Sequence, residues 1–272
     1  YTRDLTEMAR AGQLEPVIGR DAEISRMIQI LSRKTKNNPV LVGEAGVGKT
    51  ALALGLAQRV ASGNVPAEIA QMRVLELDLM NVVAGTRFRG DFEERMNNII
   101  QHIEEDGHVI LFIDELHTIM GSGSGIDSTL DAANILKPAL ARGTLRTVGA
   151  TTQDEYQKHI EKDAALSRRF AKVTIEEPSV ADSIQILQGL KETYQDHHHV
   201  TITDEAIETA VKYAHRYLTS RQLPDSAIDL LDEAAATVQN RDSNGHVKEE
   251  LTALDQALMD GKWKKAAQLL EV

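Results

Sequence analysis

The sequence predicts an α/β fold, with a parallel five-stranded sheet flanked by helices and a small all-α subdomain after it. Two observations carry this prediction. Over about the first 175 residues, short β-branched runs alternate with longer helical patterns, which is typical of a parallel sheet with crossover helices. After Pro178 the strand-like runs stop and three helical patterns follow. We therefore expect a large α/β domain over residues 1–178 and a small helical one over residues 179–242.

The expected strands are five short apolar runs. In chain order they cover residues 40–42, 74–77, 109–113, 146–149 and 172–175. Two of the helices between them stand out because their apolar residues recur at helical spacing. One begins at Asp21, which we expect to be its N-cap, and the other covers residues 91–105.

The helical subdomain is expected from residues 181–198, 203–218 and 225–240. Thr203 is a predicted N-cap of the middle helix. Residues 242–245 are typical of a loop. Beyond them four apolar residues recur at spacings of four, three and four, namely Val247, Leu251, Leu254 and Leu258. This spacing favours a coiled coil, so residues 243–272 are expected to begin a helical middle domain.

Composition narrows the classes of function. The formal net charge is −11 and no long run of Lys and Arg is present, which disfavours nucleic acid as a partner. No apolar run approaches the ~18 residues of a membrane span. The absence of cysteine excludes disulfides and thiolate metal sites and fits a cytoplasmic protein. Because the chain opens at Tyr1 and stops within helix-like sequence, we expect it to be a piece of a longer protein.

The strongest motif is a phosphate-binding loop. It consists of Gly43, Glu44, Ala45, Gly46, Val47, Gly48, Lys49 and Thr50, with Ala51 as a further nucleotide contact. The loop matches G-x-x-x-x-G-K-[ST] and stands between an expected strand and an expected helix. Lys49 is expected to reach the β- and γ-phosphates and Thr50 to bind Mg²⁺. The motif predicts ATP and Mg²⁺ as cofactors.

An acidic pair follows the expected strand at residues 109–113. Asp114 is suited to hold Mg²⁺ through water, and Glu115 is placed to polarise the attacking water. Two solvated acids at a strand end are the alternative, which the upstream loop disfavours. The pair favours hydrolysis, because the sequence shows no site for a substrate hydroxyl as a kinase needs.

Several segments together resemble the first AAA+ module of the Clp/Hsp100 unfoldases, the group of ClpB, ClpC, ClpE and ClpL. They are residues 16–20, 36–43, 112–117, 149–152 and 223–225. The resemblance covers residues 1–242 of the 272. It implies a P-loop AAA+ core with a helical lid and a homo-hexameric ring. Such a ring threads unfolded or misfolded polypeptides, for disaggregation or for delivery to a protease, with a protease or adaptor as further partner.

The resemblance also implies roles for single residues. Val17 and Ile18 would line the adenine pocket. Thr152 would sense the γ-phosphate, and capping of the next turn is the alternative role of its hydroxyl. Arg168 and Arg169 would be arginine fingers that reach the nucleotide of the neighbouring subunit.

Two further segments resemble loops that line a central pore. Phe88 stands between two arginines, which is unusual for a core residue, and would grip a passing polypeptide. The alternative is a Phe88 ring tucked under its own loop. The Gly- and Ser-rich residues 121–125 resemble a second pore loop.

Three other features are not assigned to the site. We expect the run of histidines at residues 197–199 to be solvated or to cap a helix C-terminus. His117 either orients the acidic pair or packs behind it. Ser226 stands where related modules often carry Lys, and we expect it in the helical subdomain facing the nucleotide.

Two other functions stay open at this point. One is an AAA+ ATPase that remodels nucleic acid, which the acidic balance of the chain disfavours. The other is a nucleotide-gated scaffold that binds ATP without turnover, which the intact Lys49, Asp114 and Glu115 disfavour.

Overall fold

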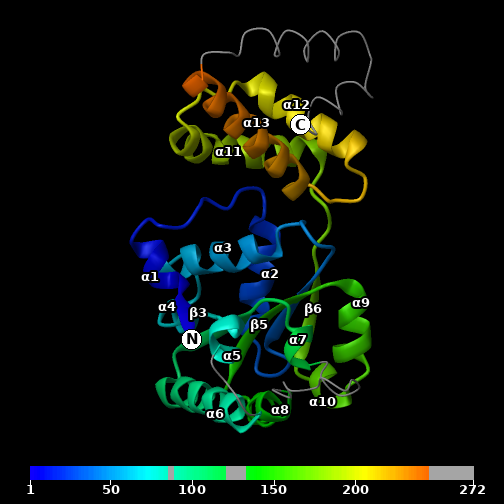
Figure 1. The fold of residues 1–272 in the computed structure, drawn as a ribbon. Helices are drawn as coiled ribbons and strands as arrows, with labels where there is room; N and C mark the ends of the chain where they lie inside the picture. Colours follow the sequence, from blue (N-terminus) through cyan, green and yellow to red (C-terminus); the bar gives the residue numbers. More distant parts are fainter. Residues whose placement is uncertain (85–88, 121–132, 245–272) are drawn as a thin grey trace.

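A computed structural model describes the chain at residues 1–84, 89–120 and 133–244 (Figure 1). Its centre is a six-stranded sheet with the order β1-β3-β4-β5-β2-β6. The five expected strands are all present and pair in parallel: β2 (Asn38–Val42), β3 (Arg73–Leu77), β4 (Val109–Ile113), β5 (Arg146–Thr151) and β6 (Phe170–Thr174). The predicted α/β class is confirmed.

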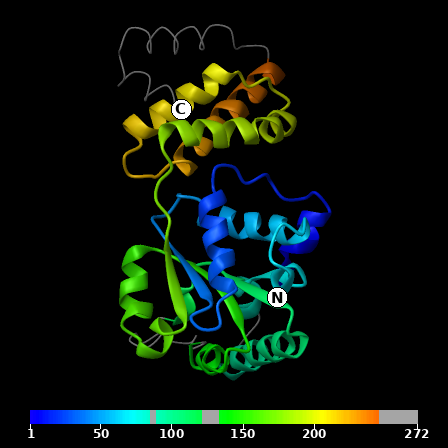
Figure 2. The ribbon, with the colours of Figure 1, turned by 180° about the vertical axis from the view of Figure 1, so that it is seen from behind.

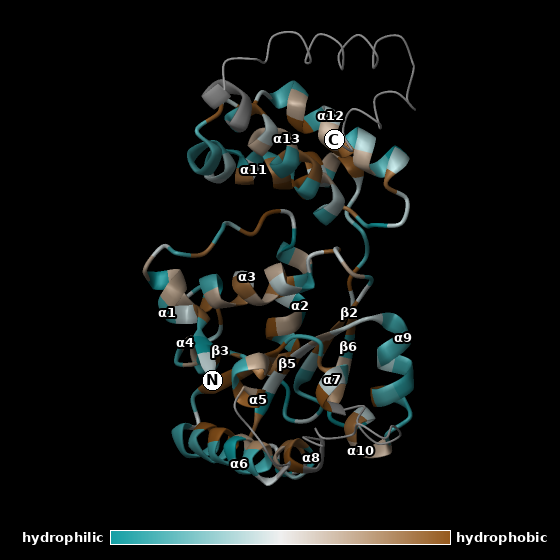
Figure 3. Cartoon of the chain, viewed as in Figure 1, coloured by the Kyte–Doolittle hydropathy of each residue, from teal (hydrophilic) through white to brown (hydrophobic). Residues whose placement is uncertain are grey.

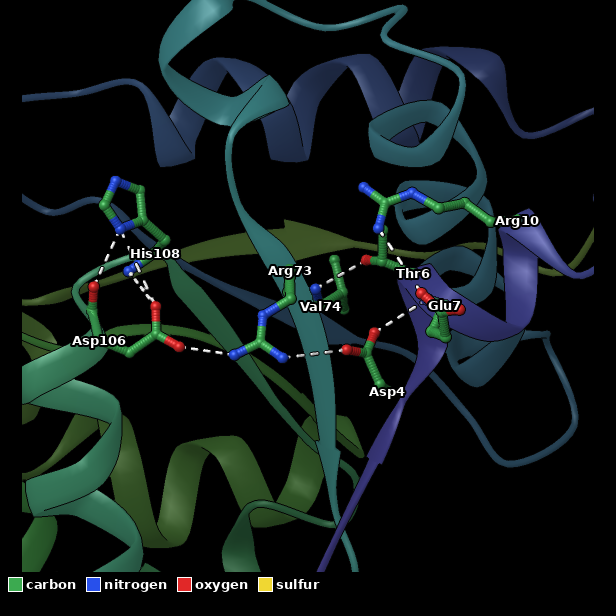
Figure 4. Close-up of polar contacts among 8 residues, drawn as sticks. All are labelled: Asp4, Thr6, Glu7, Arg10, Arg73, Val74, Asp106 and His108. Atoms are coloured by element: carbon green, nitrogen blue, oxygen red, sulfur yellow. Dashed lines mark hydrogen bonds and ion pairs between the residues drawn. The ribbon is translucent and has the colours of Figure 1, made fainter.

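The sixth strand was not predicted. β1 (Thr2–Asp4) extends the sheet at β3 in the antiparallel direction. Its three residues are too few to show a period in the sequence. Arg73 of β3 holds this corner, since its guanidinium donates to Asp106 at 2.5 Å and to Asp4 at 3.4 Å (Figure 4). The Asp106 hydrogen bond is the main cause that raises the pKa of Arg73.

Helices cover both faces of the sheet, and each face has its own apolar core. On one face lie α1 (Leu5–Arg10), α2 (Asp21–Leu31), α3 (Lys49–Ala61) and α4 (Ala67–Ala70). On the other face lie α5 (Leu79–Val83), α6 (Arg89–Asp106), α7 (His117–Met120) and α8 (Ala133–Arg142). Figure 3 shows the resulting apolar interior between helices with polar outer faces.

The start of α2 corrects one expectation. Asp21 is the first residue of the helix, and its N-cap is Arg20, which makes no capping hydrogen bond with its side chain. Asp21 instead pairs with Arg59 of α3. An acidic residue in the first helical turn interacts favourably with the positive end of the helix dipole. The start of the helix was therefore predicted correctly, although Asp21 is not its N-cap.

A separate helical subdomain follows β6 and lies beyond one end of the α/β part (Figures 1 and 2). It consists of α11 (Val180–His198), α12 (Asp204–Tyr217) and α13 (Asp225–Asn244), packed around a third apolar core. Thr203 caps α12 as predicted, because its hydroxyl accepts from the N–H of Ala206 at 3.1 Å. None of the helices in the described ranges is long and apolar enough to cross a membrane.

The end of α13 corrects a second expectation. Residues 242–244 continue the helix, whereas their composition predicted a loop. Asp, Ser and Asn are only mildly unfavourable in helices, and another turn of intrahelical hydrogen bonds outweighs that preference. The predicted coiled-coil residues from Val247 onward lie outside the described residues.

The run of histidines is only partly as expected. His199 has a φ of +56° and forms the left-handed C-cap of α11, which agrees with the capping role. His198 is not solvated, because only 6% of its surface is exposed. Its Nε2 lies 2.6 Å from Asp232 Oδ1 of α13. The sequence hid this pairing because the two residues are far apart in the chain.

Candidate nucleotide site

A cleft of about 950 Å³ lies between the carboxyl ends of the central strands and the lid helices α11 and α13. Ligands of open parallel sheets bind at this edge. The cleft is lined by most of the residues expected from the sequence: Val17, Ile18, Ala45, Gly46, Val47, Gly48, Lys49, Thr50, Ala51, Asp114, Glu115 and Thr152. The fold therefore brings together residues from four distant segments.

The phosphate loop needs glycine at three positions for two different reasons. Gly46 and Gly48 have φ values of +84° and +91°, a region that favours glycine. At Gly43 the reason is close packing, since a Cβ there would lie 2.4 Å from the carbonyl oxygen of Ile175. The loop ends where α3 begins, so its backbone N–H groups and the helix N-terminus are available to an anion.

Lys49 folds back over its own loop. Its Nζ donates to the carbonyl oxygens of Gly43 at 2.9 Å and Glu44 at 2.7 Å. Burial lowers the pKa of the Lys49 ammonium, while the nearby carboxylates of Asp114, Glu44 and Glu115 oppose this shift. The ammonium thus lies in the cleft and is held by two neutral carbonyl groups, which phosphate oxygens can replace at a gain in charge attraction.

Thr50 and Asp114 meet across the cleft, as the metal prediction requires. The Thr50 hydroxyl donates to Asp114 Oδ2 at 2.7 Å, and the other carboxylate oxygen accepts from the N–H of Glu115 at 2.8 Å. Hard oxygen donors of this kind suit Mg²⁺, which is usually bound by one or two protein groups together with phosphates and water. The described ranges contain no group of three or more His, Cys, Asp or Glu side chains that could hold a metal by themselves. The residues present therefore fit Mg²⁺ shared with a phosphate ligand.

Glu115 has an unusual backbone that places it in the cleft. Its φ is +46°, a left-handed conformation that is uncommon for residues other than glycine. The next residue, Leu116, donates its N–H to the carbonyl of Ala150 at 2.9 Å, which ties the turn to β5. Strain of this kind gathers at functional sites and is maintained by the surrounding fold.

A family model described as "ATPase family associated with various cellular activities (AAA)" matches residues 39–177, just over half of the 272. The chain belongs to the AAA family. A second model, described as an AAA lid domain, matches residues 179–271 of the same AAA chain.

Known relatives place this AAA chain in the Clp/Hsp100 group. It is 59% identical over 237 residues to the "ATP-dependent Clp protease ATP-binding subunit ClpC" of Staphylococcus aureus, covering 87% of the chain and 29% of that protein. It is 57% identical over 253 residues to "Heat shock protein 104" of Schizosaccharomyces pombe, covering 92% and 28%. The chain thus spans less than a third of the length of these relatives.

Solved structures agree with this placement. The AAA chain matches the S. cerevisiae Hsp104–ADP complex with a TM-score of 0.83 and 49% identity, over 89% of this chain and 42% of that one. It matches the closed state of Hsp104 with ATPγS and FITC casein with a TM-score of 0.81 and 49% identity, over 89% and 42%. The predicted AAA+ core with a helical lid is therefore confirmed.

The Thr152 hydroxyl caps the next turn, which was the alternative to its role as a γ-phosphate sensor. Its hydroxyl accepts from the N–H of Glu155 at 3.4 Å and caps the short helix α9 (Gln153–Glu155). Thr152 also lines the cleft of the AAA core, so the sensor role stays a prediction. The preceding Thr151 is buried, and its hydroxyl lies 3.1 Å from Nδ1 of His117. This contact ties His117 to β5, and its role in orienting the acidic pair stays a prediction.

Arg168 and Arg169 lie away from the cleft of their own AAA core. Arg168 is exposed and Arg169 partly buried, at the end of α10 (Ala164–Ser167). Neither lines the cleft, and no carboxylate in the described part of the chain pairs with either. Asp163 fixes α10 by capping its first turn and by pairing with Lys137 at 2.7 Å, which lowers the pKa of the Asp163 carboxyl.

Arg20 is a site residue that the sequence analysis missed. It is 8% exposed, and its guanidinium donates to the carbonyl oxygens of Val47 at 2.7 Å and Glu176 at 3.3 Å. It also pairs with Glu23 at 2.8 Å. Arg20 therefore joins the phosphate loop to the segment that leads into the lid. Only its position two residues after Ile18, within the segment 16–20, pointed to it in the sequence.

The lid residue that faces the cleft is Asp225, and not its neighbour Ser226 as the sequence predicted. Asp225 lines the cleft and donates its N–H to the carbonyl of Gly46 at 3.4 Å. Burial raises the pKa of its carboxyl, and the charge of Asp229 adds to the rise. Ser226 is 1% exposed and does not line the cleft, so it does not face the nucleotide as expected. Adjacent helical residues point about 100° apart, which separates these neighbours.

Proposed function

We propose that the chain is the ATP-hydrolysing motor module of a Clp/Hsp100 chaperone, which unfolds polypeptides and threads them through a homo-hexameric ring. The observation that supports hydrolysis is the 2.7 Å contact of Thr50 with Asp114 beside Lys49 and Glu115. A phosphate cradle, a metal pair and a base thus share one cleft. Phosphoryl transfer requires little more than such positioned charges.

Each residue of the cleft has a separate task in this proposal. Lys49 leaves the carbonyls of Gly43 and Glu44 and offsets charge on the β- and γ-phosphates. Thr50 and Asp114 would hold Mg²⁺, which would supply positive charge next to the phosphates. Glu115 accepts a proton from the water that attacks the γ-phosphorus. The bond between the γ-phosphorus and the β–γ bridging oxygen breaks, and the products are ADP and inorganic phosphate. Val17 and Ile18 line the apolar side of the cleft, which suits an adenine ring.

A turnover assay tests hydrolysis. Glu115→Gln is expected to lower the rate of phosphate release about 10²-fold or more, because amide cannot accept the proton, while ADP and ATP still bind. Glu233→Gln, a similar change at an exposed position of α13, is the control. Unchanged turnover in Glu115→Gln would contradict the role of Glu115 as the base. Turnover absent in the assembled wild-type parent protein, with ATP still bound, would favour the scaffold function instead.

Arg168 and Arg169 support assembly in a ring. Neither lines the cleft of its own chain, and Arg168 is exposed, as a residue that acts on a neighbouring subunit's nucleotide must be. The hexamer, the polypeptide substrate and a protease or adaptor partner all belong to the longer parent protein. We extend the proposal to a cytoplasmic location and to domains at residues 1–178, 179–242 and 243–272.

The threading role depends on Phe88, which lies outside the described residues. It is supported by the resemblance of its loop, and by the relative Hsp104, whose solved structures include casein. In the full-length parent protein, Phe88→Ala is expected to abolish stimulation of ATP turnover by casein, with basal turnover kept. Phe88→Tyr retains the ring and is expected to keep stimulation. Equal stimulation in all three proteins would contradict threading by this residue.

A further inference from the structure

A glycine interrupts the middle of α11 at the point where this helix meets the α/β part. Glycine is the weakest helix former except proline, so Gly189 needs a reason in packing. The reason lies opposite it, in Ile18. A Cβ at position 189 would lie 1.6 Å from Ile18 Cδ1 and 3.1 Å from Ile18 Cγ1. The ethyl end of Ile18 therefore occupies the space that any side chain at 189 would take.

This contact lies at the apolar wall of the nucleotide cleft. Ile18 lines the cleft from the α/β part, and Ile186 and Leu190, on either side of Gly189 in the sequence, line it from α11. The phosphate loop is held by other contacts, those of Arg20 with Val47 and of Asp225 with Gly46. The Ile18–Gly189 contact is thus separate from the loop that holds phosphate.

We propose that Gly189 is a positioning residue for the nucleoside part of the ligand. By accepting Ile18 Cδ1, it sets how closely α11 approaches the cleft and keeps that methyl group out of the space for the base. The inference rests on the proposed ATPase function and adds a specific requirement to it. The contact between Ile18 and Gly189 must affect the binding of ligands that carry a nucleoside, and must not affect the binding of inorganic phosphates.

In Gly189→Ala, the overlap between the new Cβ and Ile18 can be removed in two ways, and both have the same consequence for binding. If Ile18 rotates, its Cδ1 turns from α11 toward the cleft and narrows the space for the base. If α11 shifts, Ile186 and Leu190 move away from the base and lose contact with it. Packed interiors absorb such overlaps only by changes of this kind. In both cases binding of the nucleoside part weakens while the phosphate loop is unchanged.

Ile18→Val is the matched compensating change, because valine lacks Cδ1 and keeps Cγ1. The 1.6 Å overlap then disappears and the 3.1 Å approach to Cγ1 remains, which small shifts can accommodate. The test uses the full chain as wild type, Gly189→Ala, Ile18→Val and the double variant. Calorimetry measures the Kd of each for ADP and for inorganic tripolyphosphate, and circular dichroism checks the fold.

We expect Gly189→Ala to weaken ADP about tenfold or more and Ile18→Val to restore it to within about threefold, since directly contacting residues couple at this level. Tripolyphosphate is expected to bind all four proteins alike. Equal ADP binding by Gly189→Ala and wild type would overturn the inference. So would a double variant that stays weak, or a parallel loss of tripolyphosphate.

Should Gly189→Ala alone not fold, the double variant decides the matter. A folded double variant that binds ADP like wild type supports the fitted contact, and failure of both to fold contradicts it, because removal of Cδ1 removes the proposed overlap. The wild-type arm separately tests the proposed function. A wild type that does not bind ADP refutes nucleotide binding itself, whatever the variants do.

Discussion

The phosphate loop and the Arg168–Arg169 pair belong to the same α/β part but differ in where their partners lie. Lys49 and Thr50 make short contacts with groups of the same chain, at 2.7–2.9 Å. The two arginines have no carboxylate partner in the described part of the chain, and neither lines the cleft. The polar groups of the phosphate loop therefore have partners within the chain, whereas the exposed guanidinium of Arg168 faces solvent.

The difference indicates two kinds of functional residue. A group that acts within its own subunit can be held by that subunit before the ligand arrives, as Lys49 is. A group that acts on a neighbour must instead be presented on a fixed support, and α10, capped by Asp163, provides one. This contrast supports the proposal that the site of this AAA chain is half of a composite site.

The largest effect is expected from Arg168→Ala combined with Arg169→Ala in the assembled parent protein. An arginine finger contributes ~10³-fold or more to the rate, so turnover should fall by that factor while ADP binding is kept. The mixed ring sharpens the comparison. Subunits with both arginines replaced, mixed with Glu115→Gln subunits, should regain part of the activity, because an intact Glu115 then faces an intact arginine. Mixtures without recovery would mean that the arginines act within their own subunit.

The metal pair should produce the next largest effect. Thr50→Val removes the hydroxyl that contacts Asp114, so the gain in ATP affinity on adding Mg²⁺ should shrink about tenfold. ATP titrations with Mg²⁺ and with EDTA measure this gain directly. Thr50→Ser retains the hydroxyl and serves as the control. A Thr50→Val protein with the full Mg²⁺ effect would show that this pair does not bind the metal.

Replacing Arg20 tests whether its hydrogen bond to the phosphate loop contributes to stability and to ATP binding. Arg20→Met leaves the carbonyl of Val47 and the carboxylate of Glu23 without their donor, and should lower the free energy of unfolding by about 2 kcal/mol. ATP affinity should fall as well, because the loop loses its support. Denaturant unfolding and ATP titration measure the two effects. Arg26→Met, at an exposed position of α2, which follows Arg20, should change neither.

The smallest effect concerns the support of the arginines. Asp163→Ala should cost about 1 kcal/mol through loss of the N-cap of α10, and Asp163→Asn less, because Asn caps but cannot pair with Lys137. The pKa of Asp163 is lowered in the fold, so its stabilisation is present above the ordinary carboxyl value of 3.8 and disappears as the pH falls through the lowered value. As the pH is lowered from about 7, the thermal unfolding midpoints of the wild type and Asp163→Asn should therefore converge. A constant difference would exclude the ion pair as its cause.

Much of the fold and the central part of the site were predictable from the sequence, because their signals are local. Five strands were recognised from apolar runs, and the phosphate loop from glycines at fixed offsets before a lysine. Asp114 and Glu115 were recognised because they directly follow a buried strand. The three-residue strand β1 was not, since it depends on β3 rather than on a pattern of its own.

The sequence by itself thus determined the α/β class, the phosphate loop and the acidic pair, because a few adjacent residues encode each of them. Tertiary structure alone decided that Arg20 is buried against Val47, that His198 meets Asp232, and that Gly189 receives Ile18. These pairs are separated by 27, 34 and 171 positions, the last being the difference between 189 and 18. Such contacts form only when packing brings distant segments together, and no local period or spacing records them.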